Sequence, residues 1–169
     1  DQKKVTFIPY NNIKDSKKIL DKKKSKINCV IIEPVLASMP VVNIGNYLTF
    51  LSNYCKKNSI NLIFDEVITG FRTIEGSVQK KYKIKPDITI LGKILGGGLP
   101  IGLIGITNKI YKKINKKNNK VFFGGTFSGN SISTYIGNKT TQFIIKNKKS
   151  IFKDLSDKSN FLYKELNKF

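Results

Sequence analysis

Lys93 is the residue whose setting first indicates chemistry. It follows an apolar segment, lies outside the lysine runs, and precedes three consecutive glycines at 96–98. Burial lowers the pKa of a lysine and frees its amine as a nucleophile, and glycines let a backbone approach a flat ligand closely. Because the glycines follow the lysine, the segment is not a P-loop. The alternative is a surface lysine beside a turn, the commoner case in a lysine-rich chain.

Two further segments carry groups that could act with Lys93. Asp65 and Glu66 end an apolar run, and open α/β sheets bind ligands at the carboxyl ends of their strands. The alternative for Asp65 is a helix N-cap. Thr126 lies in a loop of small residues, 124–130 (GGTFSGN), just before an expected helix. Backbone amides and the hydroxyl could bind a phosphate there, although such a loop alone is weak evidence.

Together, Asp65, Lys93 and Thr126 suit pyridoxal phosphate. The carboxylate precedes the lysine by 28 positions, and the loop of small residues follows both. A lysine amine forms a Schiff base with the aldehyde of this cofactor, and an aspartate holds the pyridine nitrogen protonated so that the ring acts as an electron sink. We therefore expect a pyridoxal-phosphate enzyme, and we expect no metal.

The elements that must position these groups follow from hydrophobic patterning. Short apolar runs rich in β-branched residues predict buried strands, and apolar residues at helical spacing predict helices. The expected strands are 28–33, 61–65, 87–91 and 102–107, and the expected helices are 14–26, 44–58, 111–115, 131–146 and 151–167. This alternation predicts an α/β fold with three layers, α/β/α, and a mostly parallel sheet that is apolar on both faces.

Composition bounds the remaining possibilities. The 169 residues fit one domain, and the two cysteines form no disulfide framework, which favours a reducing, cytoplasmic compartment. No apolar run approaches the length that spans a bilayer, so we expect no membrane contact. The net charge of +20 invites a polyanion partner, yet Arg72 is the only arginine among 31 basic residues. Lysine-rich solvated surfaces are therefore the preferred interpretation, and we do not expect nucleic acid as a partner.

The chain resembles the class III aminotransferases, pyridoxal-phosphate enzymes of fold type I, and within them the glutamate-1-semialdehyde 2,1-aminomutases. The similarity begins near Tyr10 and continues to the last residue. The matching blocks are 32–35 (IEPV), 63–72 (IFDEVITGFR), 85–87 (KPD), 91–102 (LGKILGGGLPIG) and 125–130 (GTFSGN). The resemblance implies that residues 1–169 are the central part of the cofactor-binding large domain. An N-terminal segment and a C-terminal small domain would then lie outside a truncated chain.

The resemblance also implies roles for single residues. Lys93 is the Schiff-base lysine and moves a proton between substrate carbons, and Asp65 is the partner of the pyridine nitrogen. Val67 packs against a face of the ring. Thr126 binds the phosphate of the neighbouring subunit's cofactor, which implies a homodimer with shared active sites. Arg72 is expected to be structural or to lie at an interface.

Three functions remain open from the sequence. The first is an aminomutase that converts glutamate-1-semialdehyde to 5-aminolevulinate for tetrapyrrole synthesis, with the isolated fragment inactive. The second is a class III transaminase acting on another amine or a keto-sugar, because residues 36–38 and Ser131 depart from the aminomutase pattern. The third is a lysine-rich nucleic-acid-binding module or an inactive remnant, as the net charge would allow.

Overall fold

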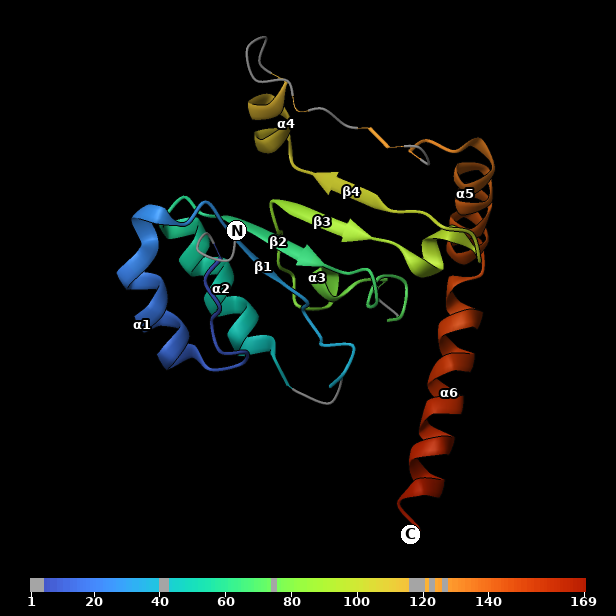
Figure 1. The fold of residues 1–169 in the computed structure, drawn as a ribbon. Helices are drawn as coiled ribbons and strands as arrows, with labels where there is room; N and C mark the ends of the chain where they lie inside the picture. The colour runs from blue at the N-terminus through green and yellow to red at the C-terminus, as the bar shows by residue number, and fades with distance from the viewer. Residues whose placement is uncertain (1–4, 40–42, 74–75, 116–120, 122–123, 126–127) are drawn as a thin grey trace.

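A four-stranded sheet forms the centre of the molecule (Figure 1). The computed structural model describes residues 5–39, 43–73, 76–115, 121, 124–125 and 128–169. The strands are β1 (Cys29–Ile32), β2 (Asn61–Asp65), β3 (Ile88–Leu91) and β4 (Leu103–Ile106). They lie in the order β1-β2-β3-β4, with β1, β2 and β3 parallel and β4 antiparallel to β3. The predicted α/β fold with a mostly parallel sheet is therefore confirmed.

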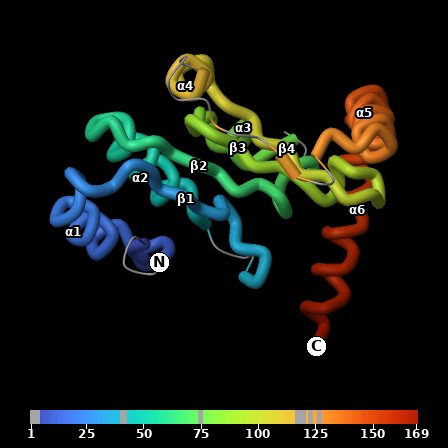
Figure 2. Tube along the Cα trace, turned by 45° about the horizontal axis from the view of Figure 1, so that its top comes forward, coloured from blue at the N-terminus to red at the C-terminus, as the bar shows by residue number. Residues whose placement is uncertain are grey.

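The longer helices lie where the spacing of apolar residues predicts them. They are α1 (Ile13–Lys23), η2 (Lys24–Lys26), α2 (Gly45–Lys57), α3 (Val78–Lys81), η3 (Lys93–Gly96), α4 (Asn108–Ile114), α5 (Ser131–Lys146) and α6 (Lys148–Leu166). Figures 1 and 2 show α1 and α2 beside β1 and β2, and α5 and α6 at the end of the sheet where β3 finishes. Over the described residues, no helix has both the length and the apolar character needed to cross a membrane.

The core lies between one face of the sheet and α2. Leu48 and Leu51 of α2 are fully buried, as is Phe64 of β2. In β1 the side chains alternate, so that Val30 and Ile32 are buried while Ile31, between them, is 59% exposed. The expectation that the strands are buried on both faces is therefore wrong for β1. It is also wrong for β4, where Leu103 and Ile104 are 42% and 58% exposed, because no described residues pack over these side chains.

Two tyrosine hydroxyls fix α1 against α2. The Tyr47 hydroxyl donates to the carbonyl of Pro9 at 3.0 Å and shares a 2.8 Å hydrogen bond with Ser16 near the start of α1. The Tyr54 hydroxyl donates to Asp21 near the end of α1, also at 2.8 Å. The first contact joins the start of α1 to the start of α2, and the second joins their ends, so the two helices run parallel. Both therefore end at the edge of the sheet where β1 and β2 begin.

Cys55 makes the stability of this core dependent on pH. Burial raises the pKa of its thiol from 9.0 to about 12, so the folded chain holds this proton more tightly than the unfolded chain. The free energy of unfolding is therefore expected to fall as the pH rises above 9 toward 12. Urea unfolding across this range measures the slope. Cys55→Ala should make the slope shallower, and an unchanged slope in that variant would contradict the assignment.

Candidate cofactor site

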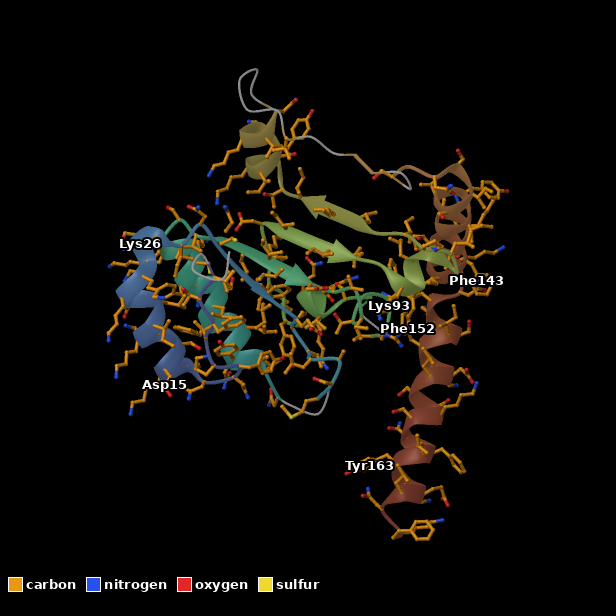
Figure 3. All side chains as sticks on the ribbon, in the orientation of Figure 1. Asp15, Lys26, Lys93, Phe143, Phe152 and Tyr163 are labelled. Carbon is orange, nitrogen blue, oxygen red and sulfur yellow. The ribbon has the colours of Figure 1, made fainter. Side chains whose placement is uncertain are left out.

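The parallel pairing of β2 with β3 brings two strand ends together at one edge of the sheet. Asp65, the last residue of β2, lies opposite Ile90 of β3. The ladder continues one residue further, where the amide of Glu66 donates to the carbonyl of Ile90 at 2.9 Å. Lys93 follows Ile90 by three residues, beyond the carboxyl end of β3 (Figure 3). The predicted carboxylate and lysine therefore come from neighbouring strand ends.

Asp65 keeps one carboxylate oxygen available. Its side chain is half-buried, and Oδ1 accepts a hydrogen bond from the amide of Val67 at 3.1 Å. Among the described residues, Oδ2 has no hydrogen-bond donor. Turns rather than a helix follow Asp65 as far as Thr73, so the N-cap alternative is wrong. The bond to Val67 orients the carboxylate and leaves Oδ2 for a ligand.

Val67 lies beside the residue that precedes the lysine. A methyl group added to Gly92 would stand 3.4 Å from Cγ1 of Val67 and 3.3 Å from the carbonyl oxygen of Ile101. The absence of a side chain at Gly92 thus allows the turn after β2 to approach the turn after β3. The structure thereby brings Asp65, Val67 and the Lys93 segment to one place.

Lys93 itself has a strained backbone. Its φ is +48°, in the left-handed region that costs a non-glycine residue about 1–3 kcal/mol and that recurs at functional sites. The side chain is exposed and forms no ion pair with any described residue. The burial expected from the sequence is therefore not found in this chain. The reason is that Gly92 takes the contacts with Val67 and Ile101, while Lys93 begins the next turn at the rim of the sheet.

Helix α5 supports the turn that carries the lysine. Gly97, the C-cap of η3, has a φ of +58° and lies directly against Thr140 and Ile136 of α5. On the same face of α5, a methyl group added to Gly137 would stand only 3.0 Å from the carbonyl oxygen of Leu95. Glycines on both sides thus allow η3 and α5 to pack backbone against backbone.

The same helix begins next to the predicted phosphate loop. Asn130 caps α5, since its Oδ1 accepts from the amides of Ile132 at 3.1 Å and Ser133 at 3.0 Å. Thr126 lies outside the described residues, so its predicted role is untested. Through α5, the segment after this loop is connected to the turn that holds Lys93.

Two neighbouring side chains have structural contacts. Arg72 donates from Nε to the carbonyl of Ile68 at 2.6 Å, in line with the expected structural role. Glu66 is completely buried, although sequence reasoning gave it no role of its own. The sequence feature that could have indicated its burial is the position of this carboxylate directly before two apolar residues, Val67 and Ile68. Within the described ranges, no group of three or more His, Cys, Asp or Glu side chains could hold a metal ion.

These groups fit a flat aromatic ligand that carries an aldehyde. Asp65 offers an acceptor for a ring N–H, Val67 offers an apolar surface, and Lys93 offers an amine. A sequence model of the family Aminotransferase class-III matches residues 3–169. The chain belongs to the class III aminotransferase family. Members of this family are enzymes that use pyridoxal 5′-phosphate, which is the group that the site fits.

Individual relatives agree with the family assignment. The chain is 40% identical over 167 residues to glutamate-1-semialdehyde 2,1-aminomutase of Methanococcus maripaludis, covering 98% of this chain and 36% of that protein. It is 39% identical to the protein of that name from Wigglesworthia glossinidia brevipalpis, covering 97% and 37%. The chain thus spans little more than a third of the length of the curated relatives it matches.

A solved structure shows the same fold. An (S)-enantioselective omega-transaminase from Thermomicrobium roseum superimposes with a TM-score of 0.81 at 25% identity, covering 91% of this chain and 35% of that one. The omega-transaminase from Sphaerobacter thermophilus gives 0.72 at 27% identity, covering 80% and 32%. The chain therefore has the same fold as about a third of each of these transaminase chains.

The contact between η3 and α5 can be tested with matched glycine variants. Gly97→Ala is expected to lower the free energy of unfolding by at least about 1–2 kcal/mol, because alanine disfavours the left-handed conformation and its methyl group would clash with Thr140. Gly102→Ala is the control, since this glycine is exposed and has open space around it. Its effect should stay within about 0.5 kcal/mol. Equal losses in the two variants, measured by urea unfolding, would contradict the packing.

Proposed function

We propose that the complete protein containing this chain is a glutamate-1-semialdehyde 2,1-aminomutase, which forms 5-aminolevulinate for tetrapyrrole synthesis. The convergence of Asp65, Val67 and Lys93 at one edge of the sheet carries the proposal, because it supplies the groups that a pyridoxal-phosphate enzyme needs. Identities of 39–40% to relatives with that name support this choice of reaction over nearly the whole chain.

Each residue has a distinct task in this proposal. When bound, pyridoxal phosphate supplies an electron sink that stabilises negative charge on a substrate carbon. Lys93 would hold the cofactor aldehyde through its amine and, once a substrate amine has displaced it, the freed amine would carry a proton between the two substrate carbons. Asp65 would accept a hydrogen bond from the ring nitrogen through Oδ2, which has no donor among the described residues, and would keep that nitrogen protonated. Val67 would pack against one face of the ring and keep water from it.

The assembly and its location belong to the same proposal. We place Thr126 of one subunit on the cofactor phosphate of its neighbour in a homodimer. We place the enzyme in the cytoplasm, where the free thiols of Cys29 and Cys55 would remain reduced.

The reaction is tested with the complete protein. Glutamate-1-semialdehyde is supplied with no 2-oxo acid, and 5-aminolevulinate is measured over time. Steady formation of 5-aminolevulinate is expected, because the mutase reaction is a net isomerisation that needs no external amino acceptor. If folded, cofactor-loaded protein forms no 5-aminolevulinate, the aminomutase proposal is wrong.

A transaminase is the second candidate. The fold similarity to the omega-transaminase of Thermomicrobium roseum favours it, as do residues 36–38 and Ser131, where the chain departs from the aminomutase pattern. Net transfer of an amino group from an amine donor to a 2-oxo acid, without 5-aminolevulinate formation, would select this function. The absence of any reaction with amino donors would count against it.

Two substitutions test the residue assignments whichever substrate is used. Lys93→Ala is expected to lower kcat by roughly a thousandfold or more, because the proposal assigns the amine to this side chain. Lys83→Ala is the control, since Lys83 is also exposed and left-handed, with a φ of +55°, but follows α3 instead of β3. Its kcat should equal that of the wild type. Steady-state kinetics measures both, and similar losses in the two variants would refute a specific role for Lys93.

Asp65→Asn tests the electrostatic task. The neutral amide can still occupy the position but holds the ring nitrogen protonated less well, so kcat should fall by about a hundredfold. Retained cofactor, measured by absorbance after dialysis, would separate this loss from a failure to bind. Wild-type turnover in Asp65→Asn would contradict the assignment.

A further inference from the structure

Glu66 is a completely buried carboxylate to which the proposed reaction gives no task. Its Oε2 accepts from the amide of Val78 at 2.7 Å and from the Thr69 hydroxyl at 3.0 Å, and its Oε1 accepts from the amide of Gln79 at 3.1 Å. A buried carboxylate without partners would be strongly destabilising. These three donors offset the cost of burying the carboxylate. Thr69 lies in the turns that follow β2, and Val78 and Gln79 lie at the start of α3.

The backbone of Glu66 adds two more connections. Its amide donates to the carbonyl of Ile90 in β3 at 2.9 Å, and its carbonyl accepts from the amide of Gly70 at 2.8 Å. Gln79 returns to β3 as well, because its Nε2 donates to the Thr89 hydroxyl at 3.2 Å. One residue thus joins the end of β2, the following turn, β3 and the start of α3.

Helix α3 depends on this carboxylate. It has four residues, too few for a helix that is stable by itself, and its first amides lack partners within the helix. Glu66 supplies acceptors for the amides of Val78 and Gln79, while Ser77 accepts from Lys80. The carboxylate therefore sets where the chain re-enters regular structure after leaving β2.

The hydrogen bonds of Glu66 stabilise the chain around it, because an apolar residue in its place would leave the amides of Val78 and Gln79 without acceptors. They also fix direction, because three hydrogen bonds of defined geometry set the position of the residue. Glu66 also lies between the two residues, Asp65 and Val67, that the proposed function uses.

We propose that Glu66 is a positioning residue for the cofactor site. Its carboxylate joins residues 66–73 to residues 76–79, the two parts of what we call the Glu66 loop. The joined loop holds the Asp65 carboxylate and Val67 in place beside Gly92 and Lys93. The inference rests on the proposed function for its consequence, whereas the positioning itself is a property of the apoprotein.

Glu66→Gln in the complete protein tests the proposal. The side chain keeps its size, but its NH2 group must face the backbone N–H of either Val78 or Gln79, so at least one hydrogen bond is lost. Amide hydrogen exchange of the apoprotein is measured at Val67, whose N–H donates to Asp65 and so reports the geometry of that carboxylate. Exchange at Val67 is expected to accelerate about tenfold or more. The dissociation constant of pyridoxal phosphate, titrated by fluorescence, should rise by a similar factor.

Tyr54→Phe is the matched control. It also removes a hydrogen bond from a mostly buried side chain, but the bond joins Tyr54 to Asp21 at the opposite edge of the sheet. In this variant, the exchange rate at Val67 and the dissociation constant of pyridoxal phosphate should both equal those of the wild type. If Glu66→Gln does not fold, Thr69→Val removes only one of the three donors, and a rise of about threefold in both readings is expected.

Each outcome decides a stated claim. Wild-type exchange at Val67 in Glu66→Gln, or in Thr69→Val if that variant replaces it, would overturn the positioning role. Faster exchange with unchanged affinity for pyridoxal phosphate would overturn the consequence for the cofactor. If the wild-type protein binds no pyridoxal phosphate, the proposed function fails, and exchange at Val67 still decides whether Glu66 positions Asp65.

Discussion

The parallel register of β2 against β3 is the constraint on which the site depends. Phe64 lies opposite Thr89 and Asp65 opposite Ile90, while Leu62 and Phe64 are buried beneath α2. Because side chains alternate along a strand, a slip of one residue would expose Phe64 and turn Asp65 into the core. The apolar core therefore specifies which carboxylate reaches the edge of the sheet beside Lys93.

Alternation along the chain also separates two adjacent carboxylates into different environments. Asp65 is half-buried with one oxygen available, whereas Glu66 is fully buried and accepts three hydrogen bonds. The first can contact a ligand, and the second can only hold protein groups. Many lysines have a comparable structural explanation, since α1, α2, α3 and α4 each carry two in their last turn, where positive charge offsets the helix dipole.

Long periodic segments were predictable from the sequence, and contacts between distant segments were not. The expected bounds of β2 and α5 agree with the structure, because each has a clear apolar pattern and recognisable flanking residues. Helices α3 and η3 were missed, since four residues are too few to show a period. The bond from Glu66 to Val78 joins residues 12 positions apart, and no local pattern encodes it. The exposure of Ile31 and Lys93 likewise depends on what packs over them.

The central claim is that Lys93 supplies the amine that binds the cofactor aldehyde. The most direct measurement adds pyridoxal phosphate to the complete protein, reduces the mixture with borohydride, and maps the modified peptide by mass spectrometry. Reduction makes the bond between amine and cofactor permanent, so the account predicts a pyridoxyl group on Lys93 and on no other lysine in stoichiometric amount. A folded protein in which Lys93 remains unmodified would contradict the account.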